Sequence, residues 1–294
     1  MEYHTSAKEL GERLQWLKDN PWHCMGLVQS GWRNIHQNHS VQQRIDRLLE
    51  QAGSTKRVTE TPLVSCLTVT KRPQYIEKII ENYQRQQYPN KELLIALNSA
   101  EVDIHAVKAQ VQKSVPSARV YQFNADLNIG FCLNWLIQQA TGDYWAKMDD
   151  DDEYGQHYLQ DYVLNVRALD IDVMGKKMGP TYFEALGQTL YRDPASMSAS
   201  DFLLHEDNRH HMAGATFFGK SDLLKRNPFS EALRSSVDVE FFRSALKKSL
   251  NVMLADDFNF TVFRAADKSH HTWKEDDGAL LKTALPVSRK EINV

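Results

Sequence analysis

From residue 63 onward, short runs rich in aliphatic and β-branched residues alternate with segments whose apolar residues recur at helical spacing. The short runs predict strands, at residues 63–70, 93–97, 120–123 and 144–148. The segments at helical spacing predict helices, one opening at Pro73 and others around residues 133–140 and 159–166. Strands that alternate with helices build a sheet covered by helices, so we expect an α/β fold.

The last of these predicted strands runs directly into five consecutive carboxylates, Asp149, Asp150, Asp151, Asp152 and Glu153. Such a cluster repels itself unless a cation neutralises it. Side chains alternate along a strand, so Asp149 and Asp151 would point to one side and could hold a hard divalent cation. The alternative is a solvated acidic loop. Ligands of open α/β sheets bind beyond the carboxyl ends of the strands, which favours a functional site here.

Composition excludes several classes of protein. The chain has 294 residues, of which 42% are hydrophobic and 25% charged, as is typical of globular domains. A net charge of -3 provides no basic face for a nucleic acid. The cysteines Cys24, Cys66 and Cys132 are too few for a disulfide framework or a closed zinc site, which favours a reducing cytosol. Neither a membrane-spanning run nor a secretory signal is present in the sequence, although peripheral docking on a membrane stays open.

The first 60 residues form a polar region with helical patterns. Capping boxes begin at Ser6, with Glu9 three residues later, and at Ser40, with Gln43 three residues later. At residues 21–24 we expect a packed aromatic turn, because no second Cys/His pair accompanies His23 and Cys24. We therefore predict a helical appendage over residues 1–60, linked through residues 53–57. It could be a dimerisation element, a membrane-proximal platform or the remnant of a longer polymerase chain.

After residue 175 the pattern becomes less regular. We expect a helix at residues 238–246 and strands near residues 251–254 and 258–263. The sequence contains no internal repeat and no long low-complexity segment.

An ordered set of motifs over residues 62–275 resembles the family 2 glycosyltransferases, which are nucleotide-sugar enzymes with a GT-A fold. The motifs are the strand, helix and second strand at residues 64–73 and 87–93, Asn128-Ile129-Gly130 with Asn134, Gly142-Asp143-Tyr144 running into residues 149–152, Val237-Asp238 with Phe242 and Arg243, and Ser269-His270-His271-Thr272-Trp273. The resemblance implies a GT-A domain at residues 61–276 with a mixed sheet flanked by helices, a nucleotide-binding half at 61–155, an acceptor half at 156–276 and a tail at 277–294.

The resemblance also implies a donor site. Asp151 would ligate Mn²⁺ or Mg²⁺ between the two phosphates, Asp149 would face the ribose side and help to hold the metal, and His271 could complete the metal shell. The ion would absorb the charge that builds on the departing diphosphate. The residues implied in nucleotide-sugar binding are Thr68, Thr70, Arg72, Asn98, Asn128, Gly130, Asn134, Asp149 and Asp150. We expect Glu153 to lie outside the site.

Asp238 is the predicted general base, which would remove a proton from an acceptor hydroxyl as that hydroxyl attacks the anomeric carbon. Its alternative role is the N-cap of a helix, and Glu240 is the alternative base. On the acceptor side the resemblance points to His211 and to the segment Gly214-Ala215-Thr216.

Two positions depart from the family pattern. At the end of the second strand, where the family usually has an acidic pair, this chain has Leu97-Asn98-Ser99, and Val237 stands where a Glu is common. The expected function is nevertheless an inverting, metal-dependent transfer from a nucleotide sugar, with UDP expected from the family alone, to a glycan or lipid-linked acceptor in bacterial polysaccharide or capsule synthesis. We expect a cytoplasmic protein at the inner face of the membrane, with a homo-oligomer conceivable through the N-terminal helices.

Two other classes of function stay open. A nucleotidyltransferase shares the sheet and the metal, but it normally has a glycine-rich phosphate loop after the first strand, and residues 68–73 contain no glycine. The other alternative is a sugar-nucleotide-binding module without catalysis.

Overall fold

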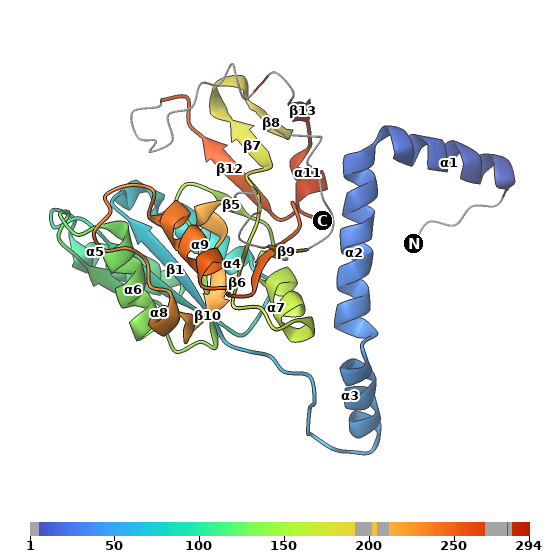
Figure 1. Ribbon diagram of the computed structural model, residues 1–294, viewed down its shortest axis with the longest axis horizontal. Helices are drawn as coiled ribbons and strands as arrows, with labels where there is room; N and C mark the ends of the chain where they lie inside the picture. Colours follow the sequence, from blue (N-terminus) through green and yellow to red (C-terminus); the bar gives the residue numbers. More distant parts are fainter. Residues whose placement is uncertain (1–5, 192–201, 205–211, 268–280, 282–283) are drawn as a thin grey trace.

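The computed structural model describes residues 6–191, 202–204, 212–267, 281 and 284–294 (Figure 1). At its centre is a mixed sheet of eight strands in the order β3-β2-β1-β4-β10-β6-β11-β9. The strands are β1 (Val64–Thr70), β2 (Lys91–Leu97), β3 (Arg119–Gln122), β4 (Tyr144–Lys147), β6 (Val173–Gly175), β9 (Phe202–Leu204), β10 (Phe218–Lys220) and β11 (Val252–Leu254). The first four strands run parallel, whereas β10 is antiparallel to both of its neighbours. The predicted α/β class is confirmed.

Helices cover both faces of this sheet because neighbouring residues of each strand point to opposite sides. Cys66 of β1 belongs to the apolar core under one set of helices, and Leu67 belongs to the core under the other set. The first set is α4 (Ile76–Arg85), α5 (Ile104–Ser114) and α7 (Tyr158–Ala168). The second set is α6 (Ile129–Gln139), α8 (Leu223–Arg226) and α9 (Val237–Lys247). The sheet is therefore buried on both faces, and polar side chains that follow its strands can meet only at its edges and ends.

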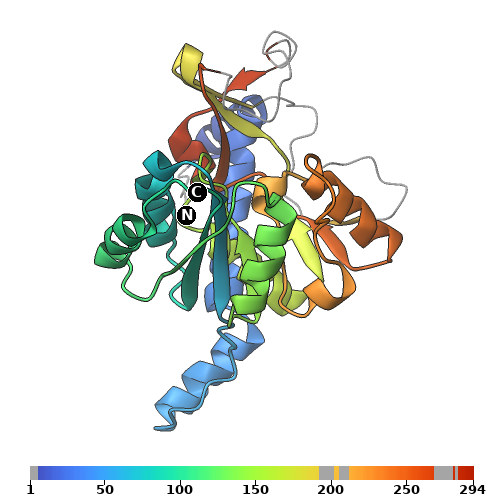
Figure 2. The same ribbon diagram turned by 90° about the vertical axis from the view of Figure 1, so that its left-hand side faces the viewer.

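A second, smaller sheet stands over one end of the first (Figure 2). Its strand order is β13-β8-β7-β12-β5. The strands are β5 (Glu153–Tyr154), β7 (Pro180–Phe183), β8 (Gln188–Tyr191), β12 (Phe260–Arg264) and β13 (Leu285–Pro286). Strand β5 directly follows the four aspartates and pairs with β12, so the acidic run lies between the two sheets. The chain also forms short 3-10 helices: η1 (Pro73–Tyr75), η2 (Glu184–Leu186) and η4 (Gly214–Thr216).

Three helices precede the sheet: α1 (Ala7–Asp19), α2 (Pro21–Asn38) and α3 (Val41–Gln51). The hydroxyls of Ser6 and Ser40 accept hydrogen bonds from the third residue beyond them, as the capping boxes predicted. The turn predicted at residues 21–24 is wrong, because proline is well accommodated at the start of a helix and Pro21 opens the 18 residues of α2. The aromatic contacts do exist there, with Trp22 packing against Phe258 and Tyr191.

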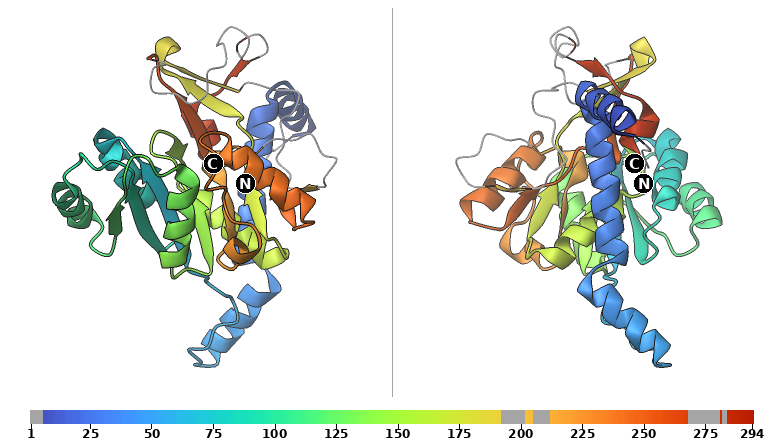
Figure 3. Two further views of the ribbon diagram at one scale, coloured as in Figure 1. Left: turned by 60° about the vertical axis from the view of Figure 1, so that its left-hand side comes forward. Right: turned by 90° about the vertical axis from the view of Figure 1, so that its right-hand side faces the viewer.

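Helix α2 lies along the body of the protein, whereas α1 and α3 extend away from it (Figures 1 and 3). A buried ion pair holds α2 to α7: Arg33 Nε donates to Asp161 Oδ1 at 2.5 Å, and its Nη2 donates to Oδ2 at 2.8 Å. Gln29 and Asn259 also donate to this carboxylate. At the other end of α2, the Trp22 indole donates to the carbonyl of Glu291 in α11 (Arg289–Ile292). No helix in the described ranges is both long and apolar enough to cross a membrane.

Candidate active site

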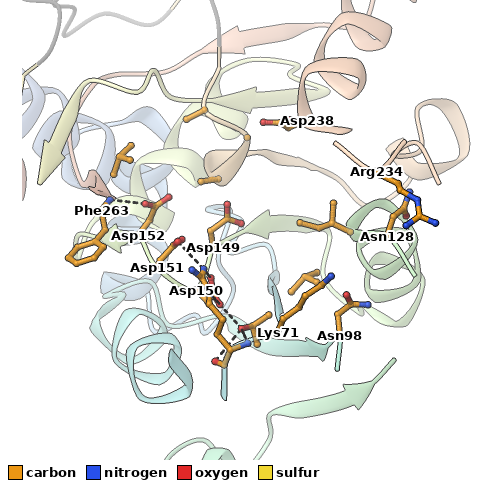
Figure 4. A pocket seen from close by; sticks show the side chains of 18 of the residues that line it. Lys71, Asn98, Asn128, Asp149, Asp150, Asp151, Asp152, Arg234, Asp238 and Phe263 are labelled. Atoms are coloured by element: carbon orange, nitrogen blue, oxygen red, sulfur yellow. Dashed lines mark hydrogen bonds and ion pairs between the residues drawn. The ribbon is translucent and has the colours of Figure 1, made fainter. Parts of the chain in front are cut away.

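A pocket of about 670 Å³ opens at the carboxyl ends of β1 and β4, next to β12 of the smaller sheet (Figure 4). Its walls come from segments that are far apart in the sequence. They include the loop after β1, the loop before α6, the acidic run, η4, and the residues that lead into α9. The predicted site residues that line it are Thr70, Arg72, Asn98, Asn128, Asp149, Asp150, Asp151, Gly214, Ala215 and Asp238. The fold therefore brings the candidate base, two candidate metal ligands and most of the candidate donor residues into one cavity.

The acidic run is neutralised largely by cations of the chain itself. Lys147 Nζ pairs with Asp149, and Arg72 bridges Asp150 and Asp151. The Arg72 guanidinium lies 2.8 Å from Asp151 Oδ2, and its Nε donates to Asp150 Oδ2 at 3.0 Å. Asp150 also accepts a hydrogen bond from the hydroxyl of Thr70 and is buried. We expected a self-repelling cluster that needs a cation, and protein side chains supply much of that charge.

The remaining two carboxylates have different surroundings. Glu153 pairs with Arg85 at 3.4 Å and does not line the pocket, which agrees with its predicted place outside the site. Asp152 lines the pocket but is buried, and its Oδ1 accepts a hydrogen bond from the backbone N–H of Phe263 at 2.9 Å. Burial, together with the charges of Asp151 and Asp149, raises the pKa of Asp152 well above its usual value.

Two of the aspartates fit a divalent cation. The side chains of Asp149 and Asp151 are 32% and 20% exposed, compared with 5% for Asp150, and both line the pocket. Their oxygens are hard donors, and Mg²⁺ commonly binds through one or two carboxylates together with substrate phosphates. The described residues contain no group of three or more acidic, histidine or cysteine side chains arranged to hold a metal. The predicted third ligand, His271, lies outside the described residues.

Asp149 is also held through its backbone. Its N–H donates to the hydroxyl of Tyr154 at 2.6 Å, and this hydroxyl donates to the carbonyl of Ala215 at 2.8 Å. Burial raises the pKa of the Asp149 carboxyl, and the neighbouring Lys147 offsets part of this rise. Through these two hydrogen bonds, Tyr154 connects the acidic run to the η4 segment, which forms another part of the pocket wall.

Asp238 faces the acidic run from the other wall of the pocket (Figure 4). It is the second residue of α9, whose N-cap is Ser236 in a left-handed conformation with φ 58°, so the alternative role of Asp238 as the N-cap is wrong. Among the residues that the structure describes, none makes a hydrogen bond or ion pair with its carboxylate. A Cβ added to Gly214 would lie 2.4 Å from Asp238 Oδ2, so the carboxylate occupies space that only glycine leaves open.

The other predicted acceptor residues differ in where they lie relative to the pocket. Ala215 lines the pocket beside Gly214. Thr216 is buried beneath them, where its hydroxyl donates to the carbonyl of Ala213 at 2.7 Å and accepts from the N–H of Lys176 at 2.8 Å. His211 lies outside the described residues.

Three of the predicted donor residues lie outside the pocket lining. Thr68 is buried within β1, and Gly130 and Asn134 lie within α6. Asn98 lines the pocket, but its amide donates to the carbonyls of Asn124 and Leu127 at 2.9 and 3.1 Å and so shapes the loop before α6.

The structure adds pocket residues that sequence reasoning missed. Lys71 and Arg234 are exposed cations on the lining, and Met178 and Val262 contribute apolar surface. Lys71 could have been found, because it follows β1 directly at the carboxyl end of a predicted strand. Arg234 belongs to an irregular loop, and no local pattern marks it.

Comparison with known proteins places this pocket in a family context. Residues 66–179 match the model of the family described as Glycosyl transferase family 2. This match includes most of β1, all of α6 and the acidic run, and it ends before Asp238. No curated protein sequence matches the chain.

Solved structures share the fold. TarS from S. aureus (residues 1–349, in complex with UDP-GlcNAc) superposes with a TM-score of 0.58 at 18% identity, covering 71% of this chain and 62% of that chain. A longer TarS chain gives 0.57 at 19% identity, covering 69% of this chain and 37% of that one. The mannosyltransferase PcManGT from Pyrobaculum calidifontis, in complex with GDP-Man and Mn²⁺, gives 0.54 at 12% identity and covers 85% and 70%. The predicted GT-A type of fold is confirmed, and this chain spans less than two thirds of the length of either TarS structure.

Proposed function

On the basis of the match of residues 66–179 to the Glycosyl transferase family 2 model, we propose that this chain transfers a sugar from a nucleoside diphosphate sugar to a hydroxyl acceptor with inversion at the anomeric carbon. The donor is a UDP-sugar, and the acceptor is a glycan or a lipid-linked glycan of bacterial polysaccharide synthesis. The reaction takes place at the inner face of the membrane.

The observation that carries the proposal is the meeting of two kinds of carboxylate in one cavity. Residues 149–152 form one wall, and Asp238, which is distant in sequence, lies on the other. Group transfer from a sugar diphosphate needs stabilisation of the leaving group on one side of the sugar and a base for the incoming hydroxyl on the other. The pocket offers both on opposing walls.

On the donor wall, the cations of the chain are suited to a diphosphate. Arg72 holds Asp150 and Asp151 in place, while Lys71 lines the pocket beside it. Asp149 and Asp151 would hold Mn²⁺ or Mg²⁺, which when bound supplies positive charge to the departing diphosphate. Lys71 at the same wall would add positive charge to that of the metal.

On the acceptor wall, Asp238 is suited to accept the proton of the attacking hydroxyl. Its carboxylate has no partner among the described residues, so its oxygens are free to accept a hydrogen bond from a substrate. Gly214 leaves the space into which this carboxylate projects. A base that faces the donor wall directs attack to the side of the sugar opposite the diphosphate, and this geometry inverts the anomeric configuration.

The choice of UDP is supported by the TarS complex with UDP-GlcNAc, while the complex of the mannosyltransferase with GDP-Man makes GDP the natural competitor. A thermal-shift comparison of UDP and GDP, each with and without Mn²⁺, tests both the nucleotide and the metal. We expect a larger rise in Tm with UDP and Mn²⁺ together than with either alone, because a ligand stabilises the folded state that binds it.

Hydrolysis of UDP-sugars in the presence of Mn²⁺ then tests catalysis. We expect Asp151→Ala and Asp238→Asn to lower turnover strongly, and Glu153→Gln to retain it. Glu153 is the matched control because it belongs to the same acidic run but does not line the pocket. A wild-type protein that binds nucleotide but turns over no donor with any acceptor would identify a binding module instead. Failure to bind any nucleotide diphosphate would overturn the proposal.

A further inference from the structure

The first turns of α6 form hydrogen bonds with the loop that leads to Asp238. This loop, residues 227–236 between α8 and α9, is termed here the α8–α9 loop. The Asn134 side chain is buried and pairs with both backbone groups of Phe229: Nδ2 donates to its carbonyl at 2.9 Å, and Oδ1 accepts from its N–H at 2.9 Å. The second amide hydrogen of Asn134 goes to the carboxylate of Glu231 at 2.8 Å.

Asn128 is hydrogen-bonded to the same loop at Ser230 and Leu233. Its Oδ1 accepts from the N–H of Phe131 at 2.8 Å and so caps α6, which fixes the direction of its amide. The amide nitrogen then donates to the carbonyls of Ser230 and Leu233 at 3.2 and 2.7 Å. The amide hydrogens of both asparagines are therefore committed to protein partners.

Gly130 brings the loop into direct contact with the helix. A Cβ added at this position would lie 2.1 Å from the carbonyl oxygen of Ser230 and 3.3 Å from Cγ1 of Val237. No side chain fits there unless the loop moves. The contact with Val237 matters because the next residue is Asp238.

The loop in turn contacts α9 itself. The ring of Phe229, whose backbone Asn134 holds, stacks on the ring of Phe241 with centroids 4.1 Å apart. Asn227, the first residue of the loop, donates from its side-chain amide to the carbonyl of Phe241 at 3.1 Å. Displacing the loop from α6 would therefore shift the start of α9, where Asp238 lies against Gly214.

We propose that Asn128, Gly130 and Asn134 are positioning residues that set the place of the Asp238 carboxylate, and that Gly130 and Asn134, which lie outside the pocket lining, do not bind the donor. This inference rests on the proposed function for its kinetic part only. It assigns to the Asn-x-Gly motif of this chain the job of aligning the base on the acceptor wall. The donor wall is built without Gly130 and Asn134.

The test uses Asn134→Ala, Asn128→Ser and the control Gln138→Ala in the full chain. Serine keeps the capping oxygen at position 128 but removes both donors to the loop, so α6 should stay intact. Gln138 is an exposed residue of the same helix. Hydrogen–deuterium exchange should rise about tenfold at residues 229–238 in the first two variants, because amides there lose their anchors, and should not change in the control.

Kinetics of UDP-sugar hydrolysis provide the second readout. We expect kcat to fall by about 100-fold in Asn134→Ala, because a base displaced by about 1 Å loses its alignment, while the Kd for UDP stays within about twofold. Unchanged exchange at residues 229–238 would overturn the inference, and so would a loss of UDP affinity that matches the loss of kcat. If the wild type binds no nucleotide, the proposed function fails on that result, and the exchange data alone decide whether α6 positions Asp238.

Discussion

The two walls of the pocket differ in how their carboxylates are partnered. On the donor wall, Asp149, Asp150 and Asp151 are each paired with a lysine or an arginine of the chain. On the acceptor wall, Asp238 has no such partner within the described part of the protein. Paired carboxylates are held in place and their charge is largely neutralised by the neighbouring cation, whereas an unpaired carboxylate is available to a substrate. In the proposed reaction, the wall with paired carboxylates holds the donor and the wall with the unpaired carboxylate accepts the proton.

The largest expected effect comes from neutralising the unpaired wall. Asp238→Asn preserves the shape of the side chain but removes its basicity, so we expect kcat for transfer to fall by about 1,000-fold. The Kd for UDP should not change, because the donor wall is intact. Steady-state kinetics together with calorimetric titration of UDP check this, and near-normal turnover would show that Glu240 or another group is the base.

A smaller loss of turnover is expected when the unpaired carboxylate is moved but kept charged. In Gly214→Ala the new methyl would lie 2.4 Å from Asp238 Oδ2, so the carboxylate must shift. We expect kcat to fall by about 10- to 100-fold with UDP binding retained. Ala215→Ser, on the same segment, is the control. Equal losses in both variants would point to general damage of η4.

The paired wall responds in the opposite sense. Arg72→Gln removes the cation that bridges Asp150 and Asp151, so we expect Mn²⁺ to bind the nucleotide-free protein about tenfold more tightly, which corresponds to ~1.4 kcal/mol. Electron paramagnetic resonance of free Mn²⁺ measures this directly. Arg85→Gln is the matched control because its partner Glu153 lies outside the pocket. Weaker Mn²⁺ binding in Arg72→Gln would mean that Arg72 supports the metal site.

The smallest effect concerns stability and pH. Burial raises the pKa of Asp152 in the folded protein, so the folded state holds this proton more tightly than the unfolded state does. The contribution of Asp152 to stability therefore falls as pH rises from the unfolded pKa to the folded pKa, and the cost is complete above the latter. Asp152→Asn removes this cost and can still accept from Phe263, so Tm should rise by about 2–4 °C at pH 7 and less at pH 4. Differential scanning calorimetry measures the Tm at both pH values. An equal rise in Tm at pH 4 and pH 7 would contradict the raised pKa of Asp152.

Much of the fold followed from local pattern. The strands β1, β2 and β4 were predicted within two residues at each end, and Ser6 and Ser40 act as the predicted caps. Helix α5 was missed, because its spaced valines and alanines give a weak apolar stripe. Pro21 was read as a turn because proline marks both turns and helix starts, and only the packing of Trp22 decides between them.

The site was harder to predict than the fold. The acidic run was located from the sequence, yet its partner Arg72 was not, because Arg72 follows β1 and meets the aspartates only when β1 and β4 lie side by side. Asn134 was read as a donor contact because the sequence identifies a polar side chain without showing which backbone lies opposite. Pairings between distant segments depend on topology, and a single sequence specifies topology only indirectly.

The anchoring of α2 has a consequence for the integrity of the chain. Arg33 is bound to Asp161 in the interior, and Trp22 is bound to the backbone of Glu291 near the C-terminal end. The segment from residue 52 to residue 63, by contrast, contains neither helix nor strand. A protease that cuts this connection would produce two fragments. We expect the fragments to stay associated, because Arg33 and Trp22 of α2 contact Asp161 and Glu291 in the other fragment. The N-terminal helices are thus joined to the rest of the protein by side-chain contacts as well as by the peptide chain.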